Sequence, residues 1–241
     1  MRTEATGYGC AIFVSELLAT VGDSLDGRRV VVSGSGNVAT YAIDKVTQLG
    51  GRVVACSDSS GYVVDEKGID LELLKQVKEV ERARLSAYAE ARPDATFVPG
   101  GSVWEVPCEV ALPSATENEI SGEDAIRMVK NGCIAVGEGA NMPTAPEGVR
   151  VFLEAGVAFA PAKAANAGGV AASALEMQQN AARESWTFEE SERRLREVMR
   201  SIHDRCAATA DEHGMPGNYV AGANIAGFAR VADAMLALGL V

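Results

Sequence analysis

Histidine and paired cysteine motifs are scarce in this 241-residue sequence, which narrows the classes of function open to it. Only two histidines occur, His203 and His213, and neither stands at a metal-ligand spacing. The five cysteines are odd in number and scattered, with no C-x-x-C pair. This usage predicts packing roles for the histidines and reduced, buried thiols, with no metal site and no disulfide framework.

Basic residues are fewer than acidic ones, and apolar segments typical of membrane or secreted proteins are also lacking. The sequence has 22 Lys and Arg against 33 Asp and Glu, for a formal net charge of -11. Nucleic acids and anionic membranes require basic patches, so we expect neither as a partner. We find no apolar run that we expect to span a bilayer and no apolar signal segment near the first residue, and we therefore expect a cytoplasmic protein.

What is present is an alternation of strand-like and helical patterns. The patterns predict strands at 28–33, 52–57, 62–65, 96–98, 109–112, 133–136 and 157–160, and helices at 6–21, 36–49, 70–91, 121–131, 146–155, 166–184, 188–213 and 223–238. Alternating strands and helices indicate a parallel sheet covered on both faces. We expect an α/β protein with a Rossmann-type, doubly wound, mostly parallel sheet and a C-terminal helical extension, with residues 1–241 forming one dinucleotide-binding domain.

The glycine-rich stretch at 30–41 is the centre of this pattern. A β-branched run enters Gly34-Ser-Gly36, and a small-residue helical pattern leaves it. Gly34 permits a sharp turn, Gly36 lets the backbone approach a pyrophosphate, and Ala39 lets the helix pack closely on the strand. The helix N-terminus then offers its free N–H groups to the phosphates. An ordinary tight turn is the alternative, but the flanking strand and helix favour a dinucleotide site.

Asp58 follows the second predicted strand, where an acidic residue binds the ribose in NAD enzymes and repels a 2′-phosphate. Ser59 comes next, and the following predicted helix carries Lys78, Arg82 and Arg84. These bases could face the same pocket. The reading that we favour is a solvated helix face on which they pair with neighbouring glutamates. From the residues alone, NAD and NADP both remain open.

Ligands of doubly wound sheets bind beyond the carboxyl ends of the strands. The segments there are 34–37, 58–59, 113–116, 137–141 and 161–166, most of them rich in small or hydrogen-bonding residues. Lys163 is the only lysine among them, and no carboxylate is obviously paired with it. The paired glycines at 168–169 fit either a tight helix crossing or a nearby ligand, and Ser173 could cap, bond back to its helix or touch a substrate. We find no convincing catalytic group.

Seven motifs together resemble one known family, the hexameric, NADP-specific glutamate dehydrogenases of bacteria. The motifs are TEATGYG at 3–9, SGSGNVA at 33–39, SDSSG at 57–61, ALPSATEN at 111–118, EGANMPT at 138–144, KAANAGGV at 163–170 and GANIAGF at 222–228. They run in order over essentially the whole chain. Two departures are Ser114, where many relatives have cysteine, and Glu81, where some have a basic residue.

The resemblance covers only the cofactor-binding half of that enzyme. It implies that the N-terminal substrate and catalytic domain, with its catalytic lysine and aspartate, is absent from this chain. The implied parent reaction interconverts L-glutamate with 2-oxoglutarate and ammonia, using NADP(H), and this chain alone is expected to be inactive. The resemblance also implies a homohexameric parent, whereas we expect a monomer or weak dimer here, with apolar surface on 6–21 and on the last helix uncovered.

The resemblance also implies site residues by position. It assigns cofactor contacts to Thr6, Gly34, Gly36, Asn37, Asp58, Ser59, Lys78, Arg84, Ala115, Thr116, Asn141 and Asn166. Of these, Ser59, Lys78 and Arg84 are the implied contacts of the 2′-phosphate. Val170 and Ser173 would touch the γ-carboxylate end of glutamate. No catalytic residue and no metal ligand is implied.

Two other readings remain. One is the cofactor domain of a leucine- or phenylalanine-type amino-acid dehydrogenase, although those relatives usually lack the stretch at 138–144. The other is a non-catalytic nucleotide-binding module.

Overall fold

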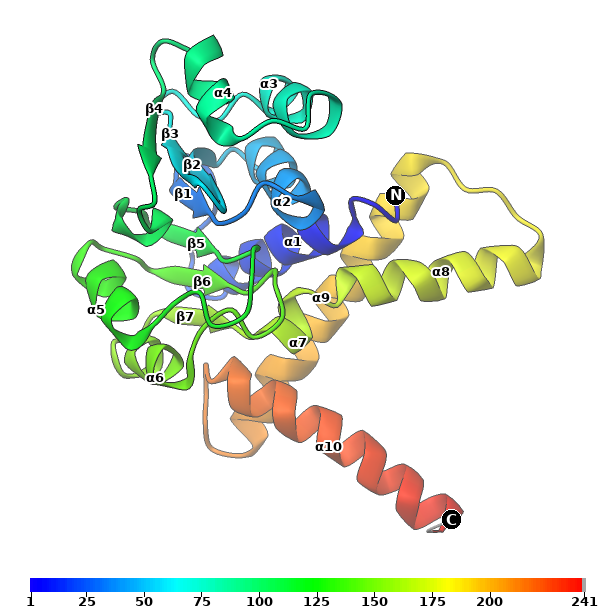
Figure 1. Cartoon of the computed structure of the whole chain (residues 1–241). Coiled ribbons are helices and arrows are strands. Elements are labelled where there is room, and N and C mark those ends of the chain that lie inside the picture. Colours follow the sequence, from blue (N-terminus) through cyan, green and yellow to red (C-terminus); the bar gives the residue numbers. More distant parts are fainter. Residues whose placement is uncertain (240–241) are drawn as a thin grey trace.

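A seven-stranded sheet forms the centre of the molecule, whose computed structural model describes residues 1–239 (Figure 1). The strands are β1 (Arg29–Val32), β2 (Arg52–Asp58), β3 (Gly61–Val64), β4 (Thr96–Pro99), β5 (Val110–Leu112), β6 (Ala135–Gly137) and β7 (Ala158–Ala160). Their order is β4-β3-β2-β1-β5-β6-β7. Strands β2, β1, β5, β6 and β7 are parallel, and β3 and β4 are antiparallel additions at one edge. The expected mostly parallel, doubly wound α/β fold is confirmed.

Helices cover both faces of the sheet. Their bounds are α1 (Ala5–Ala19), α2 (Asn37–Gln48), α3 (Leu71–Lys75), the π-helix η1 (Gln76–Val80), α4 (Leu85–Ala91), the 3-10 turn η2 (Val103–Glu105), α5 (Gly122–Lys130), α6 (Pro146–Glu154), α7 (Ala162–Ala165), α8 (Gly168–Ala182), α9 (Phe188–Glu212) and α10 (Tyr219–Leu238). One core cluster joins the sheet to α1–α4 and to the C-terminal helices. The other joins it to η2, α5 and α6.

Central strand β1 shows why the sheet is buried on both faces. Val30, Val31 and Val32 are each 0% exposed, and they alternate between the two core clusters. Burying a valine side chain stabilises the fold by about 1.5–3 kcal/mol. A continuous β-branched run is therefore what a covered, parallel central strand requires.

The helix expected at 70–91 is wrong as one element. The structure divides it into α3, η1 and α4, with a turn in which Arg82 has a φ of 55°. The Asp58 carboxylate accepts a hydrogen bond from the backbone N–H of Leu85, the first residue of α4, at 3.0 Å. This contact to a distant strand interrupts the helix, and the charge pattern along the segment carried no sign of it.

Helix α1 is buried, contrary to the apolar surface that we expected on 6–21. Helices α2, α8 and α9 pack around it within the same core cluster. Glycines allow the close approach, because a Cβ on Gly7 would lie 2.5 Å from the carbonyl oxygen of Val38, and one on Gly9 would lie 2.9 Å from the Cα of Gly168. The other half of that expectation is confirmed, because α10 carries exposed apolar side chains.

Helix α10 extends away from the sheet (Figure 1) and exposes large apolar side chains, with Phe228 73% and Leu236 86% exposed. By length and composition it could cross a membrane, contrary to our expectation that no apolar run was long enough. Its best 18-residue window has a mean hydropathy of 1.2, and 6% of that window is buried. Apolar helices that pack on protein share these properties, so they identify neither role.

Candidate cofactor-binding site

The glycine-rich turn joins β1 to α2 where the strand order reverses. Because β2 and β5 lie on opposite sides of β1, a crevice opens at this edge. Gly34 has a φ of +83°, and a Cβ there would lie 3.2 Å from the carbonyl oxygen of Ser114. Nothing lies within 4 Å of a Cβ added to Gly36. Gly34 is therefore required by the turn and by the loop after β5, whereas Gly36 leaves the backbone open to a ligand.

A cavity of about 490 Å³ lies in front of this turn. Its lining residues are Thr3, Ser35, Gly36, Asn37, Thr40, Tyr41, Lys78 and Glu79. Helix α2 begins here without a side-chain cap, so its first N–H groups have no side-chain partner. Uncapped N–H groups at the positive end of a helix dipole attract anions. The Asn37 side chain donates to the carbonyl oxygen of Thr3 at 2.7 Å and so ties this turn to the N-terminal segment.

The end of β2 carries a nearly buried carboxylate. Asp58 accepts hydrogen bonds from the backbone N–H of Ser60 at 2.8 Å and its hydroxyl at 2.5 Å, from Lys78 Nζ at 3.1 Å and from the backbone N–H of Leu85 at 3.0 Å. The Asp58 side chain is only 7% exposed. Burial opposes its ionisation, but these hydrogen bonds and the Lys78 cation hold the pKa of Asp58 below its usual range.

Lys78 and Arg84 both turn toward this strand end. The Arg84 guanidinium donates to the hydroxyl of Ser59, and Lys78 Nζ donates to the carbonyl oxygen of Ala83 as well as to Asp58. The Lys78 side chain is 17% exposed. Our favoured interpretation, a solvated face paired with glutamates, is therefore wrong for Lys78. Arg84 is exposed, as that interpretation expects, but it bonds to Ser59 rather than to a glutamate.

A second cavity, of about 580 Å³, lies on the other side of the turn. Its lining residues are Arg2, Thr6, Val38, Ser114, Ala115, Gly139, Ala140, Asn141, Asn166, Gly169, Val170 and Ser173. Asn37 lines the first cavity and Val38 the second, so the start of α2 separates the two. The Asn166 side chain donates to Asn141 Oδ1 at 2.7 Å, which joins the loop after β6 to the start of the C-terminal helices.

The first of the paired glycines of α8 serves a tight helix crossing, and the second lines a cavity. A Cβ on Gly168 would lie 2.1 Å from the carbonyl oxygen of Ala5, so Gly168 is needed where α8 crosses α1. A Cβ on Gly169 would lie 2.4 Å from the Thr6 hydroxyl and would enter the second cavity. Ser173 bonds back to the carbonyl oxygen of Gly169 at 3.2 Å and also lines that cavity.

Two carboxylates that the sequence analysis passed over hold the loops of this edge. Glu119 accepts from the backbone N–H groups of Ala115 at 3.1 Å and Thr116 at 3.3 Å. Glu138 accepts from those of Thr144 at 3.2 Å and Ala162 at 2.7 Å. Burial raises the pKa of both carboxyl groups, and the hydrogen bonds oppose that shift. The positions of Glu119 and Glu138, in or next to strand-end segments, were the sequence signal that could have identified them.

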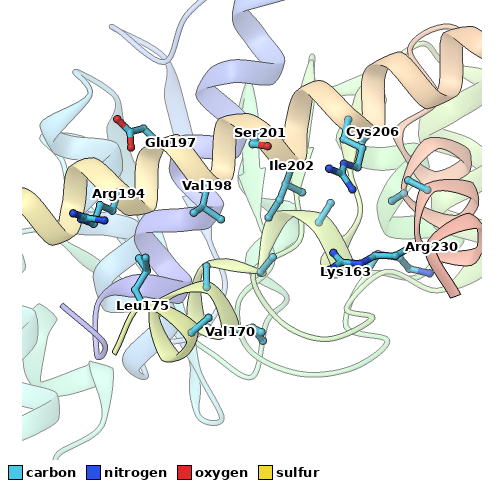
Figure 2. A pocket seen from close by; sticks show the side chains of 18 residues that line it. Lys163, Val170, Leu175, Arg194, Glu197, Val198, Ser201, Ile202, Cys206 and Arg230 are labelled. Atoms are coloured by element: carbon cyan, nitrogen blue, oxygen red, sulfur yellow. The ribbon is translucent and has the colours of Figure 1, made fainter. Parts of the chain in front are cut away.

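A third cavity, of about 810 Å³ and so larger than these two, lies elsewhere, between α7, α8, α9 and α10 (Figure 2). It shares Lys163 and Ala164 with the strand-end segment 161–166 and Val170 with the second cavity, but its remaining lining is largely apolar and helical. Lys163 donates to the Asn224 side chain at its rim. No part of the glycine-rich turn reaches this cavity, so its size does not make it the nucleotide site.

Comparisons with known proteins match the chain throughout. A family model described as glutamate/leucine/phenylalanine/valine dehydrogenase covers residues 1–239. The chain belongs to this family. The chain is 51% identical over 243 residues to an NADP-specific glutamate dehydrogenase of Salmonella typhimurium, covering 100% of this chain and 54% of that protein. It is 47% identical to an NAD(P)-specific glutamate dehydrogenase of Xylanibacter ruminicola, with 100% and 54% covered.

The fold agrees with this assignment. The crystal structure of Plasmodium falciparum glutamate dehydrogenase superposes with a TM-score of 0.97 at 41% identity, over 100% of this chain and 52% of that one. The expected resemblance to the cofactor-binding half of glutamate dehydrogenases is confirmed, and the chain is an NAD(P)-binding domain of that type. It spans about half the length of the relatives that it matches.

In this dehydrogenase domain, the structure gathers most of the predicted site residues at one edge. Thr6, Ala115, Asn141, Asn166, Val170 and Ser173 line one cavity, and Gly36, Asn37 and Lys78 line the other. Gly34 lies in the turn between them, and Asp58, Ser59 and Arg84 lie at the end of β2. Thr116 is exposed and lines neither cavity. Sequence reasoning missed Arg2, which lines the second cavity and pairs with Glu176 at 3.1 Å.

Proposed function

We propose that this chain is the NADP(H)-binding domain of a glutamate dehydrogenase. Such an enzyme converts L-glutamate, NADP and water to 2-oxoglutarate, ammonia and NADPH, and catalyses the reverse reaction. The choice of NADP rests on one observation, the hydrogen bonding of the Asp58 carboxylate. Its carboxylate already accepts four hydrogen bonds within the chain, one of them from the Lys78 cation.

A ribose-binding aspartate must keep an oxygen free for the sugar hydroxyls. Asp58 is 7% exposed and turned into the protein, so it offers little to a ribose and its charge is offset by Lys78. The groups next to it are a hydroxyl on Ser59 and the guanidinium of Arg84. A hydroxyl and two cations suit a phosphate monoester better than a neutral diol.

The remaining residues fit the rest of such a cofactor. The open backbone at Gly36 and the uncapped N-terminus of α2 would hold the pyrophosphate, beside Gly34 and Asn37. The nicotinamide riboside would lie in the second cavity, near Thr6, Ala115, Thr116, Asn141 and Asn166. When bound, the nicotinamide supplies the hydride acceptor or donor, and this domain binds and orients it.

We propose that the γ-carboxylate end of glutamate meets the same cavity at Val170 and Ser173. Arg2 adds a cation to this end, although its bond to Glu176 must then be shared. We assign no catalytic acid or base to this chain, and propose that those groups come from the part of the relatives that the chain does not span. Five buried, unpaired thiols suit a reducing compartment, and we propose that the protein acts in the cytoplasm.

Calorimetric titration of the chain with NADPH and NADH tests the choice of cofactor. We expect tighter binding of NADPH, and a loss of about tenfold or more in NADPH affinity in Lys78→Ala and in Arg84→Ala, with NADH little changed. Lys67→Ala is the matched control, because Lys67 is 68% exposed and pairs with Asp94 away from both cavities. Equal or tighter binding of NADH by the unaltered chain would overturn the proposal.

A further inference from the structure

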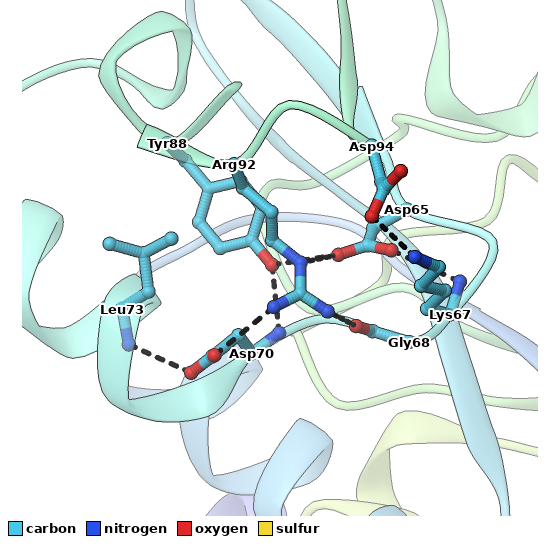
Figure 3. Close-up of polar contacts among 8 residues, drawn as sticks. All are labelled: Asp65, Lys67, Gly68, Asp70, Leu73, Tyr88, Arg92 and Asp94. Atoms are coloured by element: carbon cyan, nitrogen blue, oxygen red, sulfur yellow. Dashed lines mark hydrogen bonds and ion pairs between the residues drawn. The ribbon is translucent and has the colours of Figure 1, made fainter. Parts of the chain in front are cut away.

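A buried polar cluster outside both cavities involves Asp65, at the end of β3 (Figure 3). The Asp65 side chain is 0% exposed. One carboxylate oxygen accepts from the backbone N–H of Lys67 at 3.0 Å. The other accepts from the Tyr88 hydroxyl at 3.2 Å and from Nε of Arg92. A fully buried carboxylate is costly unless it is satisfied in this way, so the cluster has a demanding geometry.

The same cluster holds both ends of the segment 70–92. Asp70, the N-cap of α3, donates its backbone N–H to the Tyr88 hydroxyl at 2.8 Å, and its carboxylate lies 3.2 Å from the Arg92 guanidinium. Arg92, the C-cap of α4, also donates to the carbonyl oxygen of Gly68 at 3.3 Å. The beginning of the segment is therefore tied to Tyr88 and Arg92 near its end, and both of these residues bond to the buried Asp65 carboxylate.

Lys78 and Arg84 lie between these two ends. Lys78 is on the π-helix η1, and Arg84 is the N-cap of α4. The chain between them is irregular, with Arg82 in the left-handed region. Tyr88 lies one helical turn after Arg84 on the short helix α4, so a shift of Tyr88 moves Arg84 with it. The positions of both cations thus depend on how the ends of the segment are held.

We infer that Asp65, Tyr88 and Arg92 are positioning residues that hold Lys78 and Arg84 against the end of β2, and thereby set the preference of this domain for a nucleotide bearing a 2′-phosphate. The inference rests on the proposed NADP function. Besides the turn at Lys67 and Gly68, the cluster holds the 70–92 segment. The start of α2 and the loops after β5 and β6 are held by other contacts, through Asn37, Glu119 and Glu138. Disrupting the cluster should therefore weaken the contacts of the 2′-phosphate and spare the rest of the dinucleotide.

The test measures NADPH and NADH binding by calorimetry in Asp65→Asn and Tyr88→Phe. We expect Asp65→Asn to weaken NADPH binding by about tenfold and NADH binding by less than about threefold. Tyr88→Phe keeps the ring and removes only the hydroxyl that links Asp65 to the start of α3, so we expect a smaller change in the same direction. Asp94→Asn is the matched control, with the same chemical change at a side chain 60% exposed.

Amide hydrogen exchange of the cofactor-free chain gives a second readout. The backbone N–H groups of Ala83 and Leu85 are bonded to Val77 and Asp58. They should exchange faster in Asp65→Asn and at the normal rate in Asp94→Asn. Retained NADH binding shows that a variant is folded, and Tyr88→Phe replaces Asp65→Asn if the latter does not fold.

The outcomes separate this inference from the function on which it rests. If the unaltered chain shows no preference for NADPH, the proposed function fails. If it prefers NADPH and Lys78→Ala removes that preference, but neither cluster variant changes the ratio of the two affinities, the proposed function stands and the positioning role is wrong. Equal losses of NADPH and NADH affinity in the cluster variants also contradict it, because they indicate a general loss of structure.

Discussion

Three carboxylates at the edge of the sheet accept backbone N–H donors, and two of them join two segments of the site. Asp58 links the end of β2 to α4, Glu119 holds the loop after β5, and Glu138 links the loop after β6 to α7. Carboxylate bonds to N–H groups are stronger than bonds between neutral groups. The loops are therefore shaped before any ligand arrives, which lowers the cost of ordering them on binding.

Glu119 makes a pH-dependent contribution to stability. Burial raises its pKa in the folded state above the ordinary value of 4.5, so the folded chain binds the proton more tightly than the unfolded chain. The stability that this provides is complete below the ordinary pKa and is lost as pH rises through the raised one. Glu119→Gln keeps an oxygen for the two backbone donors and cannot titrate.

We therefore expect the free energy of unfolding of the unaltered chain, relative to Glu119→Gln, to fall as pH rises from about 4 and to level off above the raised pKa. Urea denaturation at a series of pH values between about 4 and 8 measures this difference. A difference that stays constant with pH, or grows as pH rises, would show that the burial of Glu119 does not control its ionisation.

At the scale of elements, the Lys45 side chain connects α2 to two other helices. Its side chain is 2% exposed, its Nζ lies 2.7 Å from a carboxylate oxygen of Glu192 on α9, and it stands 4.1 Å from the ring centroid of Tyr8 on α1. Because α2 presents its N-terminus to the first cavity, the contacts of Lys45 with α1 and α9 help to hold that N-terminus in position. A buried cation is held by its partners and leaves them uncompensated when it is removed.

Lys45→Ala should lower the free energy of unfolding by about 3 kcal/mol, since it removes a buried cation from its ion pair with the partly exposed Glu192 and from a cation–π contact. Arg193→Ala on α9 is the control, because its bonds to Glu190 and Glu197 lie at the surface and should matter much less. Urea denaturation of both variants compares them. Similar losses of unfolding free energy in the two variants would mean that the contacts of Lys45 stabilise the fold no more than a surface ion pair does.

The strands and most of the helices could be predicted because each carries its own local pattern. The run Val30–Val32 is apolar for a buried strand, and Gly34 and Gly36 mark the turn. The break in the 70–91 helix could not be read locally, because its cause is Asp58, a residue distant in sequence. The burial of α1 depended likewise on contacts with α8 and α9.

The candidate site could be predicted where the residues lie in segments beyond the carboxyl ends of strands. Asn141 lies in the loop after β6, Asn166 lies at the end of the short helix α7 that follows β7, and the structure joins them at 2.7 Å. The role of Lys78 could not be predicted from charge pattern, because its partner Asp58 lies on a strand. Arg2 precedes the first helix and gave no signal, because only the crossing of α1 and α8 brings it to the second cavity.

At the scale of the whole molecule, the exposed face of α10 bears on assembly. Phe228, Val231, Leu236 and Leu238 are each at least 60% exposed, which is unusual for a helix of a soluble monomer. We propose that the full-length parent assembles as a homohexamer and that this chain alone is a monomer or weak dimer. Light scattering should give a mass close to 25.2 kDa or twice that value. A stable hexamer of this chain would show that it carries the assembly contacts itself.

A crystal structure of this chain with NADPH would test the proposed cofactor site most directly. We expect the pyrophosphate at the start of α2, the 2′-phosphate beside Ser59, Lys78 and Arg84, and the nicotinamide in the cavity lined by Thr6 and Asn166. Asp58 should keep its bonds to Ser60 and Leu85. A nucleotide bound instead in the large cavity between α8, α9 and α10, or an Asp58 turned out to hold the ribose, would contradict it.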